Sequence, residues 1–114
     1  MREKWQRIIM EASTIKNTRE RDVEGYLTRR LAGIGLACKK FIPDQDNGMP
    51  DRVVLLPDQR VLWVELKTIG GELSELQKLR HVELQRAGHA VEVVWTKAQA
   101  DRLVERLAAD LRVS

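Results

Sequence analysis

The chain has 114 residues and a mass of 13.1 kDa, which is enough for one domain and too little for two. Hydrophobic residues make up 43% and charged residues 32% of it, a balance typical of a folded globular domain rather than a disordered chain. No apolar run approaches the ~18 residues of a membrane-spanning helix, and the charged N-terminus lacks the apolar stretch of a secretory signal. We therefore expect a cytoplasmic protein. The single cysteine, Cys38, excludes an internal disulfide and a cysteine-based zinc site.

The net charge is +3, from 20 basic and 17 acidic residues, but its distribution is uneven. Acidic residues are absent from Gly25 to Pro43, where four basic residues fall: Arg29, Arg30, Lys39 and Lys40. A local basic surface of this kind attracts phosphate, and an ordinary solvated face is the alternative explanation.

The first part of the chain carries two helical patterns. Apolar residues at helical spacing predict a short amphipathic helix over residues 3–12, with Trp5, Ile8 and Ile9 on its apolar side. A second helix is predicted from a cap at Asn17 or Thr18 to about Ala32. Its apolar residues share one face: Val23, Leu27, Leu31 and Ile34.

Strands dominate the middle of the chain. We predict them over residues 36–42, 52–56 and 61–67, the last two forming an antiparallel hairpin that pairs residue 56 with 61 and 52 with 65. A helix from Ser74 to about Ala87, a strand over 91–95 and a last helix capped by Thr96 complete the chain. The order α-α-β-β-β-α-β-α predicts an α/β domain with a small mixed sheet flanked by helices, in which the third and fourth strands are parallel.

The chemistry is concentrated in Gly48-Met49-Pro50-Asp51 and in Glu65-Leu66-Lys67. Residues i and i+2 of a strand point to the same face, so Glu65 and Lys67 project together, and the hairpin brings Asp51 beside them. Two carboxylates so close repel unless a positive charge lies between them. Lys67 is one candidate for that charge, and Mg²⁺, which prefers one or two carboxylates plus water and phosphate, is another. A surface hairpin with a cross-strand salt bridge is the alternative explanation.

These residues, together with Gly70-Gly71 and Leu73-Ser74-Glu75-Leu76-Gln77, resemble the VRR-NUC (virus-type replication-repair nuclease) domain of the PD-(D/E)XK nuclease superfamily. The resemblance runs from about Arg19 to Trp95. It implies a restriction-endonuclease-like core and cleavage of DNA phosphodiesters with Mg²⁺ or Mn²⁺ as cofactor. It also implies that Asp51, Glu65 and Lys67 are catalytic, and that Asp51, Glu65 and the backbone carbonyl of Leu66 bind the metal.

The small size is similar to that of stand-alone viral and bacterial members of this family. We therefore expect one nuclease domain over residues 1–114. Within it, residues 1–17 would be an amphipathic N-terminal extension, 18–96 the nuclease core and 97–114 a C-terminal helix.

The family also has a glutamate on its first core helix, for which Glu20 and Glu24 are both candidates. Helical geometry places Glu20 within about 25° of the centre of the apolar face and Glu24 about 65° from it. We therefore favour Glu20 as a catalytic and metal-binding residue and keep Glu24 as the alternative. A capping box with Asn17 also explains Glu20. Gln77 matches the glutamine that the family carries on the helix after this strand, which implies a catalytic role in contact with the phosphate or in support of the water and Lys67. Ser74-Glu75-Leu76-Gln77 is also a capping-box pattern, which is the alternative explanation.

The expected function is a metal-dependent DNA endonuclease that selects branched DNA, such as four-way junctions or flaps, in replication or repair. Phosphate contacts are expected from the basic stretch and from Arg52, for which a salt bridge is the alternative. A homodimer through the first and last helices would place two sites against two strands. A non-catalytic nucleic-acid-binding or assembly module on the same fold is the rival function, and an RNA-directed nuclease is a third.

The other chemically notable residues receive structural roles. His81 and His89 lack metal-ligand spacing, so we expect surface or interface positions for them and no zinc site. Trp63 and Trp95 lie in predicted strands and are expected in the core. We expect Cys38 to be a small apolar filler.

Overall fold

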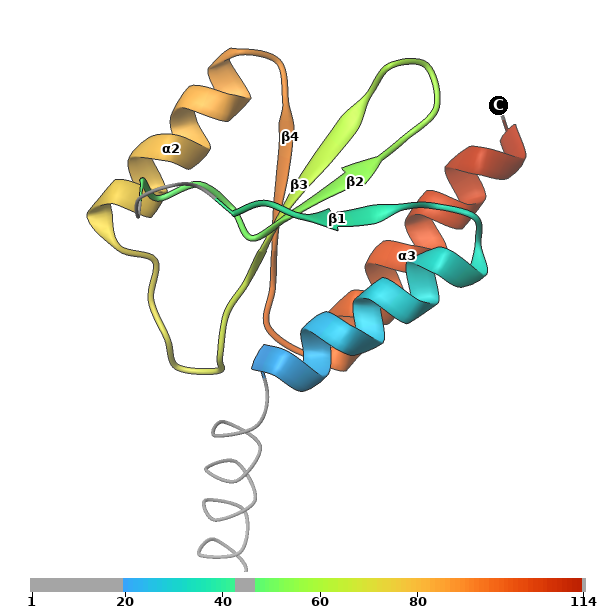
Figure 1. The fold of residues 1–114 in the computed structure, drawn as a ribbon, viewed down its shortest axis with the longest axis horizontal. Coiled ribbons are helices and arrows are strands. Elements are labelled where there is room, and N and C mark those ends of the chain that lie inside the picture. The colour runs from blue at the N-terminus through green and yellow to red at the C-terminus, as the bar shows by residue number, and fades with distance from the viewer. Residues whose placement is uncertain (1–19, 43–46, 114) are drawn as a thin grey trace, which may run out of the picture.

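The computed structural model describes residues 20–42 and 47–113. The elements in chain order are a helix over residues 20–33, strands β1 (Cys38–Lys40), β2 (Arg52–Leu55) and β3 (Val61–Leu66), helix α2 (Glu75–Arg86), strand β4 (Ala90–Val94) and helix α3 (Lys97–Val113) (Figure 1). The helix predicted over residues 3–12 lies outside the described residues. From residue 20 on, the predicted order of elements is confirmed. Within the described ranges, no helix has the length and apolar character needed to cross a membrane.

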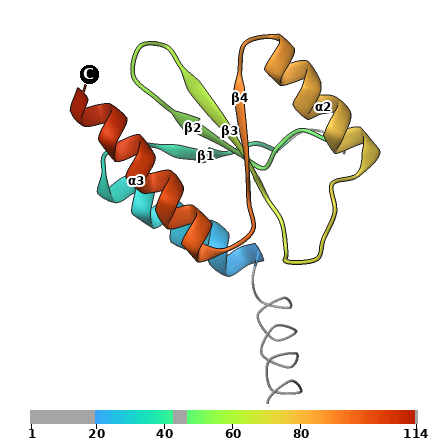
Figure 2. The same ribbon diagram turned by 180° about the vertical axis from the view of Figure 1, so that it is seen from behind.

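The strands form one mixed sheet in the order β1-β2-β3-β4. The first three strands pair antiparallel, whereas β3 and β4 are parallel, as expected for two strands joined by a helical crossover. Figures 1 and 2 show the helix over residues 20–33 and α3 side by side on one face of the sheet, with α2 on the other. The α/β fold expected from the sequence is therefore confirmed.

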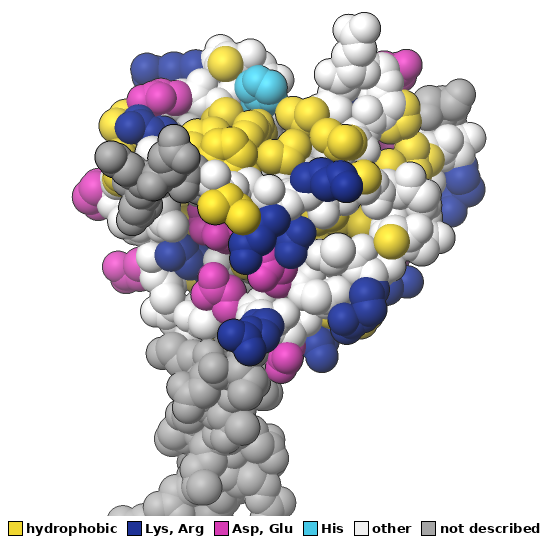
Figure 3. Space-filling model, viewed as in Figure 1, with side chains coloured by type: hydrophobic (Ala, Val, Ile, Leu, Met, Phe, Trp, Pro, Cys, Tyr) yellow, Lys and Arg dark blue, Asp and Glu magenta, His cyan; other side chains and the backbone are white. Residues whose placement is uncertain are grey.

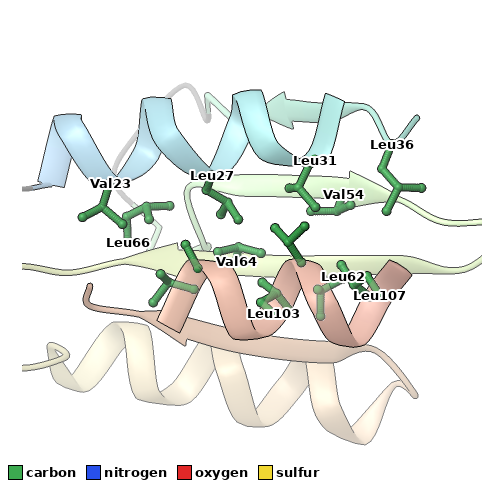
Figure 4. Packing of buried hydrophobic residues seen from close by; sticks show 13 residues of the cluster. Val23, Leu27, Leu31, Leu36, Val54, Leu62, Val64, Leu66, Leu103 and Leu107 are labelled. Atoms are coloured by element: carbon green, nitrogen blue, oxygen red, sulfur yellow. The ribbon is translucent and has the colours of Figure 1, made fainter. Parts of the chain in front are cut away.

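The hydrophobic core lies between the sheet and the two helices on its first face (Figure 4). Alternate residues of β3 point into it, because side chains of a strand alternate between faces. The fully or nearly buried residues from the sheet and the two helices include Val23, Leu27, Leu31, Val54, Leu62, Val64, Leu66, Leu103, Val104 and Leu107. The apolar faces predicted for the second and last helices are thus used by the core.

Trp63 does not lie in this core, so its predicted position is wrong. The alternation that buries Leu62 and Val64 turns Trp63 to the opposite face, where it is half-buried. Its ring makes edge-to-face contacts with Phe41 and His89, at centroid distances of 5.4 and 6.4 Å. Trp95, just after β4, is also half-buried.

The hairpin register is one residue away from the predicted one. Arg52 pairs with Val64 and Leu55 with Val61, whereas Leu56 bonds through its N–H to the carbonyl of Arg60. The cause is one extra residue on the β2 side of the turn: the Arg60 N–H bonds to the carbonyl of Pro57, so Leu56 and Pro57 both lie opposite Arg60, as in a β-bulge. The turn itself is tight, and its Asp58 and Gln59 have φ of 61° and 64°. Two positive φ angles define the type I′ turn that suits a two-residue hairpin loop. Continued past the end of β2, this register sets Asp51 directly opposite Glu65.

The same turn predicts a stabilising substitution, Gln59→Gly. Left-handed backbone costs an L-residue about 1–2 kcal/mol, and glycine avoids that cost while losing about 0.5–1 kcal/mol in backbone entropy. We expect urea unfolding to give a free energy of unfolding up to about 1 kcal/mol higher. The control, Arg60→Gly, changes a residue of the same turn without a positive φ and should lower stability. An unchanged or lower value for Gln59→Gly would contradict this account of the turn.

Candidate active site

Asp51 and Glu65 meet at the end of β2 and β3. Glu65 is only 2% exposed, and Asp51 accepts a hydrogen bond from the backbone N–H of Leu66 at its Oδ2, with an N–O distance of 2.9 Å. On the other side, the N–H of Lys67 donates to the carbonyl of Val94 at 3.1 Å and continues the parallel pairing. The backbone of the sheet therefore holds all three predicted residues in one small region.

The proximity of the two carboxyl groups perturbs Glu65 strongly. Burial raises the pKa of Glu65 to about 8, and a hydrogen bond with Asp51 and the negative charge of Asp51 add to the rise. Lys67 opposes the rise in this pKa with its positive charge. The sheet thus places Glu65 beside a carboxyl group whose negative charge opposes its ionisation.

Helix α2 contributes two further side chains to Glu65. The Nε2 of Gln77 donates to Oε2 of Glu65 at 3.4 Å, and Nε2 of His81 lies 3.4 Å from Oε1. The capping box predicted for Gln77 is also present, because its Oε1 accepts from the N–H of Ser74 at 2.8 Å. The predicted capping box of Gln77 is therefore confirmed, and the same side chain also contacts Glu65; its catalytic role stays a prediction.

His81 was expected at the surface, and this expectation is wrong. The residue is 8% exposed and lies one helical turn after Gln77, on the side of α2 that faces Glu65. Burial lowers its pKa, as does the charge of Lys67. The spacing of Gln77 and His81, four residues apart, was the available signal, but it became meaningful only once Gln77 was placed on Glu65.

Two glycine-containing segments bring these elements together. Gly48 has φ of 77°, and a Cβ on it would lie 2.8 Å from backbone atoms of Leu76 in α2. This close approach sets the loop that carries Asp51 against the first turn of the helix that carries Gln77. After β3, the N–H of Gly71 bonds to the carbonyl of Thr68 in a turn where Gly70 has φ of 82°. This turn leads the chain from Lys67 towards the N-cap of α2.

The two candidate glutamates of the helix over residues 20–33 have different surroundings. Burial raises the pKa of Glu20, as does the charge of Asp51, while Lys67 lowers it. Glu20 is thus within electrostatic reach of the Asp51–Glu65 pair. Glu24 instead binds Arg52, whose Nε donates to Glu24 Oε2 at 2.8 Å. Glu20 therefore lies near the charges of the site, whereas Glu24 has a structural partner in Arg52.

The predicted phosphate-binding residues are spread over the molecule. Arg52 is engaged by Glu24 and by the carbonyl of Cys38, which its Nη1 reaches at 3.3 Å. Arg30 forms an ion pair with Asp101 at 3.3 Å. The other three residues of the predicted set are exposed: Arg29, Lys39 and Lys40. Lys39 and Lys40 lie on the edge strand β1, where lysines also discourage unwanted strand pairing.

The donor set fits a hard divalent cation. Mg²⁺ and Mn²⁺ favour carboxylate and carbonyl oxygens, and Asp51 and Glu65 offer two carboxylates whose mutual repulsion a cation would relieve. Among residues 20–42 and 47–113, no three histidine, cysteine or acidic residues are grouped so that side chains alone could hold a metal. A cation here would consequently keep coordination positions for a backbone carbonyl, water or phosphate. Figure 3 shows acidic and basic side chains interleaved below a band of hydrophobic ones on one face of the molecule.

The raised pKa of Glu65 predicts a pH dependence of stability without metal. The unfolded chain ionises this residue from about pH 4.5, whereas the folded protein retains the proton up to about pH 8. The stability contributed by the bound proton is therefore complete below pH 4.5 and is lost as the pH rises to 8. Over this range the free energy of unfolding changes by at most about 1.4 kcal/mol per pH unit.

Urea unfolding in EDTA at pH 5, 6.5 and 8 measures this effect. Wild type should lose stability relative to Glu65→Gln across the series. The control Glu83→Gln, in which an exposed glutamate loses its ion pair with Arg80, should follow the wild-type slope. Parallel pH curves for wild type and Glu65→Gln would contradict the assigned pKa.

The chain is similar to known proteins in sequence and in fold. The chain matches no model of a known protein family. A curated protein named "Putative nuclease p44", from Acyrthosiphon pisum secondary endosymbiont phage 1, is 34% identical over 76 residues, which are 67% of this chain and 82% of that protein. A solved structure described as a VRR_NUC domain is 29% identical, with a TM-score of 0.68 over 75% of this chain and 94% of its own. Sequence and structure thus agree, and the chain belongs to the VRR-NUC nuclease family.

Proposed function

We propose that this protein is a metal-dependent DNA endonuclease. The observation that carries the proposal is the pairing of Asp51 with the buried Glu65, whose pKa reaches about 8. A fold that only needed stability would gain from replacing such a pair by apolar residues. Perturbed acids with a lysine beside them are instead typical of sites that bind cations and transfer protons.

The proposed roles follow from the contacts of each side chain. Asp51, Glu65 and the Leu66 carbonyl would hold Mg²⁺ or Mn²⁺, with Glu20 as an outer carboxylate, and the cation would supply Lewis acidity and an activated water. Lys67 lies where its charge acts on both Glu20 and Glu65, so it can neutralise charge that develops on the phosphate. Gln77 orients Glu65 and supplies an amide beside the phosphate. The amino end of α2 adds backbone N–H groups that favour an anion.

DNA as substrate, and branched DNA in particular, belongs to this proposal. The exposed residues Arg29, Lys39 and Lys40 would contact its backbone. Work on DNA in replication or repair would take place in the cytoplasm of a bacterium or an infected host cell.

A homodimer would set two sites against two strands of a branch. The last helix does not offer the expected dimer surface, because Leu103, Val104 and Leu107 face the core of their own chain. The exposed apolar residues of α2, Leu76, Leu79 and Val82, offer another surface for a second copy. The helix predicted over residues 3–12 lies outside the described residues.

Cleavage assays on labelled duplex, flap and four-way-junction DNA test the function. Wild type should cleave with Mg²⁺ or Mn²⁺ and stop in EDTA, and Lys67→Ala should lower the rate by about 10²–10³-fold because it removes a charge that stabilises the transition state. The matched control Lys78→Ala removes an exposed lysine of α2 that only pairs with Glu75 at 3.2 Å, and should cleave like wild type. DNA binding without cleavage of any substrate would instead support the non-catalytic module on the same fold, and cleavage of RNA alone the RNA-directed nuclease.

Substitutions of Glu20 and Glu24 should have different effects, one on activity and the other on stability. Glu20→Gln should lower cleavage by about 10–100-fold, as expected for an outer carboxylate, with little loss of stability. Glu24→Gln should instead lower the free energy of unfolding by about 1 kcal/mol, because it removes the charge that faces Arg52. Rates at saturating metal and urea unfolding of both variants measure the split. The opposite pattern would reassign the site carboxylate to Glu24.

A further inference from the structure

The polar interior of the described chain consists of two facing side chains. Among the described residues, Glu65 and His81 are the polar or charged residues classed as buried, at 2% and 8% exposed. They face each other, with 3.4 Å between Nε2 of His81 and Oε1 of Glu65. A buried polar group is costly unless it has a partner, so each of these side chains depends on the other.

Helix α2 reaches both oxygens of Glu65 from one face. Residues four apart lie on the same side of a helix, which places Gln77 on Oε2 and His81 on Oε1. Gln77 is itself fixed, because its Oε1 and its backbone N–H both bond to Ser74. Two contacts at separate oxygens limit rotation of the carboxyl group, whereas one contact would leave it free to turn.

We infer that His81 is a positioning residue that, with Gln77, holds the Glu65 carboxylate in the orientation that binds the divalent cation. The inference rests on the metal-dependent function proposed above and extends it to a side chain outside the Asp51, Glu65 and Lys67 set. His81 touches neither DNA nor cation in this scheme and acts through Glu65. Groups that orient a metal-binding carboxylate typically change metal affinity or activity by about 10–100-fold.

The neighbourhood of His81 argues against a purely structural role. Leu79 and Val82 on the same helix are 50% and 41% exposed, so α2 leaves apolar residues in solvent while it buries a histidine. An apolar residue at position 81 would fill the buried space at a lower desolvation cost.

A matched pair of substitutions tests the inference. His81→Gln and His81→Met place unbranched side chains of similar length on α2, and only glutamine keeps an N–H donor for Glu65. Mn²⁺ binding is measured by calorimetry on the folded protein without DNA. We expect His81→Met to raise the dissociation constant for Mn²⁺ by about 10–100-fold. The dissociation constant of His81→Gln should stay close to that of wild type.

Two controls separate this role from a general loss of structure. His89→Leu removes the other histidine, which is exposed and contacts Trp63, and should leave Mn²⁺ binding unchanged. In the Glu65→Gln background, His81→Met should add little further loss, because the group that it positions is gone. Circular dichroism confirms that each variant is folded, and His81→Leu replaces His81→Met if the latter is not.

The outcomes distinguish the two proposals. Folded His81→Met or His81→Leu with wild-type Mn²⁺ affinity would overturn the role of His81 while leaving the nuclease intact. Equal losses in His81→Gln and His81→Met would also overturn it, because the N–H donor would then be irrelevant. A wild type that neither binds Mn²⁺ nor cleaves DNA would overturn the proposed function and this inference with it.

Discussion

Two carboxyl groups are held side by side at the end of a hairpin, and the rest of the site is arranged around their repulsion. The register of β2 and β3 sets Asp51 opposite Glu65, and the bond from the Leu66 N–H prevents Asp51 from turning away. Burial adds to the cost of ionising Glu65, because its carboxyl group is removed from water without a full counter-charge. Such a pair depends on rigid surroundings, and the divalent cation proposed above would relieve its repulsion.

The two faces of the sheet have different roles, one in stability and the other in the candidate site. One face buries the aliphatic core against two helices, and this core holds β3 in place through Leu62, Val64 and Leu66 (Figure 4). The opposite face carries Glu65, the half-buried Trp63 and helix α2. Because neighbouring residues of β3 serve opposite faces, the rigidity of the core passes directly to Glu65 through the backbone.

The sequence was sufficient for the parts of this arrangement that depend on local pattern. Alternation along β3 predicted that Glu65 and Lys67 share a face, and Ser74 with Gln77 predicted the cap of α2, which the structure contains. The predicted register is wrong by one residue because Leu56 and Pro57 both lie opposite Arg60, so the β2 side of the turn carries one extra residue. The hydrophobic pattern of the two strands does not reveal this extra residue.

The partners of His81 and Arg52 were not evident from local sequence pattern, because distant segments of the chain supply them. His81 is buried because Glu65, 16 residues earlier, needs a partner there, and the helix pattern alone shows only a polar residue. Arg52 pairs with Glu24 across 28 residues, so its charge is already neutralised within the chain. Trp63 is a different case, because the local alternation that makes Leu62 a core residue already places its neighbour on the opposite face.

Helix α2 combines structural and functional roles in the same atoms. The Gln77 side chain closes the capping box through its oxygen and reaches Glu65 through its nitrogen, so the cap fixes the rotamer that serves the site. The close approach of Gly48 to Leu76 then sets the Asp51 loop against this same turn. One helical turn therefore aligns contributions from β2, β3 and α2. This coupling fixes the charged side chains of the site relative to one another through a few short segments of the chain.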